Sequence, residues 1–194
     1  MKKQSNMKAI IAMVFAVIAS TTMLSCMNDS DTFPDEAKEM QGIYQGMMEV
    51  TSDYGDTTIA VHIQLSNALS IKPMPLVFML KPFVEVNPES EIGKELSDLT
   101  YASPYAVSVN DTKDSVFVFV PTTVSNIPIP LGDKYHQLEV AIGGADMQTV
   151  YSVKNKTLNL VLKSREAVYD NVKQNSYKGV TMTVKNARKL IGEQ

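Results

Sequence analysis

The chain has 194 residues, with 18 Lys and Arg, 21 Asp and Glu, and a single cysteine. This acidic balance excludes a nucleic-acid partner, because proteins that bind phosphate backbones gather Lys and Arg on one surface. A single cysteine excludes a disulfide within the chain, so the fold depends on its apolar core.

The first 25 residues have the pattern of an export signal. Lys2, Lys3 and Lys8 precede an uncharged run, Ala9 to Ala19, which is typical of a signal-peptide core. The run is shorter than the roughly 20 apolar residues that a spanning helix needs. Met23-Leu24-Ser25-Cys26 follows and resembles the site at which bacterial lipoproteins are cleaved and lipidated.

We therefore expect residues 1–25 to be a lipoprotein signal peptide and Cys26 to carry the lipid, so that the membrane is a partner of the chain through this anchor. The alternative is an ordinary cut after the small residues Ser20-Thr21-Thr22, which would leave Cys26 as a stray thiol.

The 169 residues from Cys26 onward suit one domain. All three lysines of the signal lie before Cys26 and no acid does, so this part has 15 basic and 21 acidic side chains and a formal charge of −6. Residues 26–41 are polar and acidic and predict a flexible tether, with a short helix over Asp35 to Met40. Residues 42–194 are predicted to form one β-rich domain.

The first part of this domain predicts a hairpin and two helical segments. Apolar and polar residues alternate over Thr57 to Leu65, which is typical of a half-buried strand, and Ile43 to Val50 supplies its partner across a polar turn. Prolines disfavour a regular central strand between Leu69 and Leu99. We expect an apolar helical turn at Leu76 to Lys81 and a helix at Glu89 to Leu99.

The second part predicts further strands with one irregular crossing. Pro121, Pro128 and Pro130 indicate that 121–131 is irregular and partly apolar. The predicted strands are Tyr101 to Val109, Ser115 to Val120, His136 to Ile142, Thr149 to Val153, Thr157 to Lys163 and Lys178 to Lys185. The expected fold is mainly β: a single antiparallel β-sandwich or calycin-like barrel of about eight strands with one or two short helices.

Motifs for catalysis are absent from the sequence. It contains no nucleophile elbow, zinc-protease helix, phosphate loop or dinucleotide loop. His62 and His136 are expected to face solvent, and Asp53 and Asp56 to stabilise a turn by bonding their own backbone. We therefore predict no catalytic residues, no metal site and no cofactor, and we expect that the protein is not an enzyme.

The lipidation motif, the acidic tether and the opening strand Gly42-Ile43-Tyr44-Gln45-Gly46 together resemble outer-membrane lipoproteins of Bacteroidetes, a domain-of-unknown-function group with calycin-like or sandwich-like β folds. This resemblance implies a lipid-anchored protein of the outer membrane, on either its surface-exposed or its periplasmic face. It also implies O-glycosylation at Asp followed by Ser or Thr and a small or aliphatic residue. Thr57 and Ser115 match that pattern.

Two functions are consistent with these features. The first is non-enzymatic binding of a small apolar or sugar-like ligand, in a cavity lined by inward residues of the strands. Those residues are Ile59, Val61, Ile63, Val116, Val118 and Val120. The alternative is an accessory module that docks on an envelope protein through exposed Ile127, Ile129 and Leu131.

Overall fold

The computed structural model describes residues 34–131, 134–145 and 148–190. Pro34 to Gln194 form one compact unit, and it alone is considered below. The predicted signal peptide, the lipidation site Cys26 and the tether up to residue 33 lie outside the described residues. Within the described ranges, no helix combines the length and apolar character that crossing a bilayer requires.

The unit is mainly β, as the sequence predicts, and its strands form one curled antiparallel sheet. The central order is β4-β3-β2-β1-β12-β10. The strands are β1 (Gly42–Ser52), β2 (Gly55–Leu65), β3 (Leu69–Lys72), β4 (Tyr101–Ser103), β5 (Ala106–Val109), β6 (Ser115–Phe119), β7 (Thr123–Leu131), β8 (Lys134–Gly144), β9 (Val150–Ser152), β10 (Thr157–Tyr169), β11 (Val172–Lys173) and β12 (Val180–Lys189).

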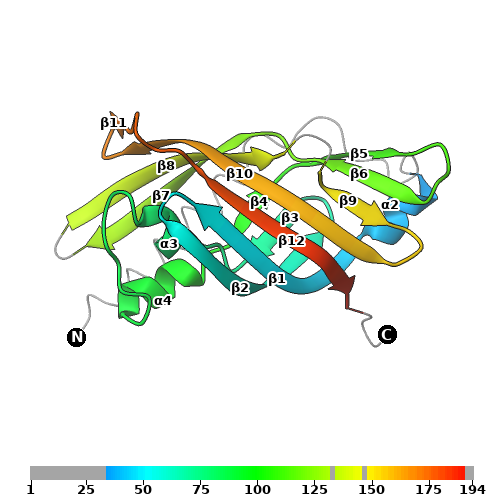
Figure 1. The fold of residues 1–194 in the computed structure, drawn as a ribbon, viewed down its shortest axis with the longest axis horizontal. Helices are drawn as coiled ribbons and strands as arrows, with labels where there is room; N and C mark the ends of the chain where they lie inside the picture. Colours follow the sequence, from blue (N-terminus) through cyan, green and yellow to red (C-terminus); the bar gives the residue numbers. More distant parts are fainter. Residues whose placement is uncertain (1–33, 132–133, 146–147, 191–194) are drawn as a thin grey trace. The chain divides into compact units, whose positions relative to one another are not determined.

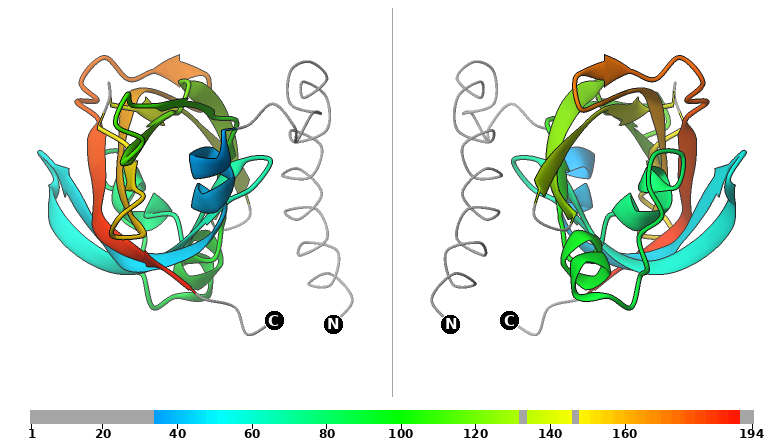
Figure 2. Two further views of the ribbon diagram at one scale, coloured as in Figure 1. Left: turned by 90° about the vertical axis from the view of Figure 1, so that its right-hand side faces the viewer. Right: turned by 90° about the vertical axis from the view of Figure 1, so that its left-hand side faces the viewer.

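The sheet divides at β10. One side of β10 pairs with β12, whereas the other side pairs with β9 near its start and with β8 further along. One branch continues from β9 to β6 and β5, and the other from β8 to β7. Figure 2 shows how the sheet curls around its interior. The Tyr101 hydroxyl of β4 lies 3.4 Å from both Thr123 Oγ1 and the Ile142 carbonyl oxygen, so it links the first strand of the curl to the last two.

Three short helices lie at the two ends of the unit (Figure 1). They are α2 (Asp35–Met40), α3 (Leu76–Leu80) and α4 (Glu91–Ser97). The last two fall within the helical segments that the sequence predicts. α2 also forms where predicted, but Ala37 and Met40 are fully buried, so residues 34–41 are part of the folded unit although the sequence placed them in the tether. Two apolar side chains three residues apart give this polar segment one buried face.

The segment 121–131 differs from the expected irregular crossing, because Thr123–Leu131 is a regular edge strand. Its pairing with β8 places Pro128 opposite Gln137. The Gln137 N–H donates to Asp170 and its carbonyl accepts from the Asp170 N–H, so Gln137 directs both backbone groups away from β7. The paired proline therefore loses no ladder hydrogen bond, which is how an edge strand accommodates it.

The number of strands is larger than expected, since the sheet has 12 where the sequence suggested about eight. Three of the differences are β3 in the proline-containing region, β7, and the short β11. The predicted strand Tyr101 to Val109 is also interrupted, at Pro104 and Tyr105, to give β4 and β5. Proline and edge positions weaken the periodic signal in each case.

Candidate functional site

The interior of the curled sheet is a packed core. Val61, Ile63 and Val116 have no exposed surface, and Val118 and Val120 are also buried. A side chain that lined a water-sized cavity would keep some accessible area, so zero exposure indicates close packing. The expectation that these inward residues line a ligand cavity is therefore wrong for Val61, Ile63 and Val116.

Two tyrosines fill the core near α2. The ring of Tyr44 packs edge-on against Tyr151, with their centroids 6.2 Å apart. The Tyr44 hydroxyl donates to the Met40 carbonyl oxygen at the end of α2, and burial raises the pKa of Tyr44 far above its ordinary value. The Tyr151 hydroxyl is buried and has no hydrogen-bond partner among the described residues. This region therefore contains core side chains rather than a binding site.

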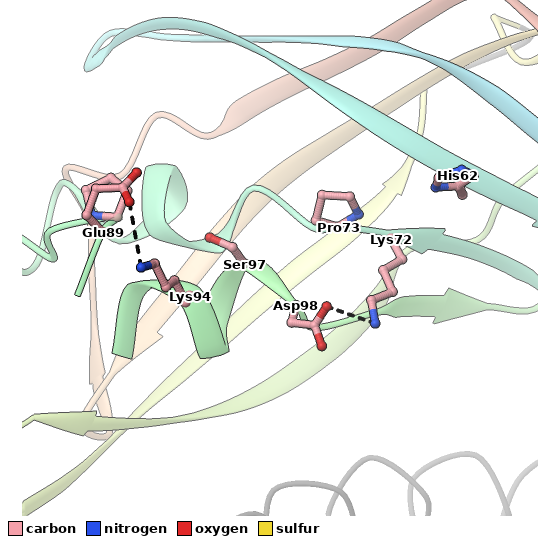
Figure 3. A pocket seen from close by; sticks show the side chains of 8 residues that line it. His62, Lys72, Pro73, Glu89, Lys94, Ser97 and Asp98 are labelled. Atoms are coloured by element: carbon pink, nitrogen blue, oxygen red, sulfur yellow. Dashed lines mark ion pairs between the residues drawn. The ribbon is translucent and has the colours of Figure 1, made fainter. Parts of the chain in front are cut away.

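A hollow on the outer surface is the candidate binding site. It has a volume of about 490 Å³ and is open to solvent. Figure 3 shows its walls, which come from the outer side of β2, the end of β3 and the C-terminal half of α4 with the loop before it. The residues that line it are His62, Lys72, Pro73, Pro88, Glu89, Lys94, Ser97 and Asp98.

Local sequence explains how these walls are placed. Alternation along β2 turns His62 outward, as predicted, and the strand register puts it opposite Lys72 of β3. Ser90 begins α4 by accepting a hydrogen bond from the Gly93 N–H at 3.0 Å, a common N-cap arrangement. A Cβ at Gly93 would lie 2.2 Å from the Asn87 carbonyl oxygen, so glycine allows the 87–89 loop to pack closely against the helix.

Charges in the hollow are balanced and exposed. Lys72 Nζ lies 2.9 Å from Asp98 Oδ1, and Lys94 Nζ lies 3.8 Å from Glu89 Oε2. Exposed pairs of this kind contribute about 0–1 kcal/mol each to folding, so their groups can turn to a ligand with little loss of stability. The hollow therefore offers two ammonium donors and two carboxylate acceptors beside the proline rings and the imidazole.

A second polar cluster, which the sequence did not predict, surrounds His136. Its Nδ1 lies 2.6 Å from Asp170 Oδ2, and its ring stacks on Tyr169 with centroids 5.6 Å apart. Phe83 also stacks on Tyr169, with the two ring centroids 5.5 Å apart. The Gln137 N–H and the His136 side chain both bond Asp170 and lower the pKa of its carboxyl group. The sequence signal available was the Asp170-Asn171 pair, which is typical of a tight hairpin turn.

The predicted glycosylation residues lie in separate hairpins. Thr57 is half-buried and is the third residue of β2, close to the β1–β2 turn. Ser115 is half-buried at the start of β6, and its hydroxyl donates to Asp114 Oδ1 at 2.9 Å. Asn110 also bonds Asp114, which lowers the pKa of that carboxyl group.

The exposed docking residues expected in the proline-containing segment are placed differently. Ile127 and Ile129 are buried on the inner side of β7, and Leu131 is half-buried. The pairing with β8 directs every second residue of β7 inward, and these isoleucines occupy two such positions. The prediction that Ile127 and Ile129 are exposed is therefore wrong.

The described residues contain no group of three or more His, Cys, Asp and Glu side chains close enough to hold a metal ion. Comparisons of the chain with protein-family models, with curated proteins and with solved structures found no match.

Proposed function

We propose that the chain is a lipid-anchored lipoprotein of the cell envelope whose β domain binds a small, sugar-like ligand without catalysis. The observation that carries this proposal is the open hollow between β2, β3 and α4, with its balanced donors and acceptors. The apolar ligand that the sequence also allowed has less support, because the interior is packed.

The size and chemistry of the hollow suit a hydroxyl-rich ligand. A volume of about 490 Å³ falls within the range of small-molecule sites. Carboxylates of Glu89 and Asp98 would accept hydrogen bonds from sugar hydroxyls, while Lys72 and Lys94 would donate to ring and hydroxyl oxygens. Pro73 and Pro88 supply apolar surface for the C–H face of a sugar ring.

The second part of the proposal is the location of the protein. The motif ending at Cys26 supports lipidation, and the resemblance to outer-membrane lipoproteins supports that membrane as the location. Docking on another envelope protein is the alternative function. Its original basis is weaker, since Ile127 and Ile129 are buried and β7 carries prolines along its free edge.

The ligand proposal is tested with the lipidated, full-length protein in detergent, titrated calorimetrically with glucose, galactose, N-acetylglucosamine and glucuronate. We expect saturable heat with at least one of these sugars, and its loss in Asp98→Asn and Lys94→Ala. Lys163→Ala is the matched control, because Lys163 is exposed on β10, three strands from β2 in the sheet. Absence of saturable binding with all four sugars, or equal weakening by the control, would contradict the proposal.

A further inference from the structure

The outer surface where the chain enters the β domain exposes three large apolar side chains. Ile43 and Met47 of β1 are 44% and 54% exposed, and Leu190 after β12 is 44% exposed. Ile43 and Met47 are four residues apart on one strand and point to the same side of the sheet. The Leu190 N–H donates to the Ile43 carbonyl oxygen at 2.7 Å, which places these two residues side by side.

Basic side chains lie beside these apolar residues. Arg188 pairs with Gln45, between Ile43 and Met47, and points to their side of the sheet, whereas Lys189 pairs with the buried Tyr44 and points to the other side. The β9–β10 turn brings Lys154 and Lys156 to the same end, because Thr157 pairs with Arg188. We call Ile43, Met47 and Leu190, with Arg188 and Lys154, the N-terminal surface.

This surface has a local positive excess on a chain whose overall charge is negative. Lys156 lies 3.1 Å from Glu39 Oε1, and Lys189 donates to the Glu39 backbone carbonyl. Among the residues that the structure describes, the ion pairs include no acidic partner for Arg188 or Lys154. A cluster of cations beside apolar side chains fits an anionic, amphipathic partner.

The length of chain before the domain limits where this surface can be. Cys26 is eight residues before Pro34, and an extended chain spans at most about 3.3–3.6 Å per residue. A lipid on Cys26 therefore holds Pro34 within about 28 Å of the bilayer. Only α2 separates Pro34 from the start of β1, so the N-terminal surface belongs to the part of the domain nearest the anchor in the chain.

We propose that the N-terminal surface rests on the lipid bilayer, with Ile43, Met47 and Leu190 in the interfacial region and the basic side chains against anionic headgroups. This inference rests on the proposed lipid anchor and adds a second membrane signal to it. Lipid chains and a basic patch commonly act together in this way. Gln45, which lies between Ile43 and Met47, pairs with His62 of β2, so this contact would place the His62 wall of the hollow beside the membrane.

The absence of tryptophan from the chain gives a direct test. Met47→Trp introduces a single reporter on the N-terminal surface, opposite the small side chain of Ala60. Val172→Trp is the matched control, since Val172 is an equally apolar residue, 61% exposed, on β11. Each lipidated full-length variant is reconstituted into vesicles of phosphatidylethanolamine and phosphatidylglycerol whose acyl chains carry bromine, which quenches tryptophan that reaches the bilayer.

We expect quenching of Met47→Trp and none of Val172→Trp. Adding Arg188→Gln to the first variant removes one cation and should shift the ratio of quenched to unquenched protein about fivefold toward the unquenched form. Equal quenching of the two tryptophans would overturn the proposal, and so would the absence of quenching in both variants. The absence of quenching is the result expected if the surface binds a protein and not lipid. The intact mass of the purified chain shows separately whether Cys26 carries lipid. If it does not, the unlipidated Met47→Trp chain is added to the same vesicles, and its quenching still tests contact between the N-terminal surface and the bilayer.

Discussion

The two ends of the domain use their side chains in different ways. At the α2 end, Met40, Tyr44 and Tyr151 are fully buried and join the helix to the core of the sheet. At the α4 end, two exposed ion pairs surround an open hollow. The comparison indicates that Met40 and the two tyrosines join α2 to the core, whereas the charged groups around the hollow contribute little to the fold and are available to the proposed ligand.

The largest expected effect concerns the proposed lipid anchor at Cys26. Cys26→Ala removes the only thiol that can accept lipid, so the protein should move from the membrane fraction to the soluble fraction of the cell envelope. Fractionation followed by immunoblotting measures this change. Continued membrane association of the variant would contradict lipid anchoring.

The next prediction compares how much a substitution at each end of the domain lowers the free energy of unfolding. Met40→Ala leaves a cavity beneath α2 and should lower the free energy of unfolding by about 2–5 kcal/mol. Lys94→Ala at the hollow should change it by no more than about 0.5 kcal/mol, because Lys94 is exposed. Urea unfolding followed by circular dichroism compares the two variants, and similar losses would remove the distinction between the ends.

A smaller effect distinguishes the two core tyrosines. Tyr44→Phe removes the hydrogen bond to the Met40 carbonyl and should cost about 1–3 kcal/mol, since that acceptor is left unpaired inside the protein. Tyr151→Phe removes a buried hydroxyl that has no partner among the described residues, so it should be neutral or stabilising. The same unfolding measurement applies, and a greater loss for Tyr151→Phe would show that its hydroxyl is bonded.

The smallest effect is a pH dependence at the His136 cluster. The pKa of Asp170 is lowered in the folded protein, so this carboxylate adds stability above the unfolded value of about 3.9 and loses that contribution as pH falls through the lower folded value. Asp170→Asn should therefore be less stable than the wild type at pH 7, with the difference shrinking as the pH falls below about 4. Urea midpoints at several pH values measure this, and a constant difference would exclude the linkage.

The sequence predicted the elements in which local pattern and tertiary packing agree. The alternation from Ile59 to Leu65 corresponds to the observed inner and outer sides of β2, and the helix predicted at Glu89 to Leu99 contains α4. The sequence did not predict β7. Proline disrupts a strand only where its missing N–H would face a neighbouring strand, and the pairing of Pro128 with Gln137, which shows that it does not, is known only from the structure.

The candidate site was less predictable than the fold. His62 was recognised as outward-facing, but Lys72, Lys94 and Asp98 lie far from it in the sequence and meet it only through the β2–β3 register and the position of α4. The His136–Asp170 contact depends on the β8–β10 pairing in the same way. Whether inward residues line a cavity or fill a core is also invisible in the sequence, since Val61 and Ile63 suit both.

Amide chemical-shift mapping with whichever sugar gives saturable heat tests the central claim most directly, because it locates the bound ligand on the domain. We expect the shifted amides to cluster on β2 and β3 near His62 and Lys72 and on α4 near Lys94 and Asp98, with the core residues Val116 and Tyr151 unchanged. Shifts concentrated on Val116, Val118 and Tyr151 would place the ligand inside the curled sheet and contradict the account.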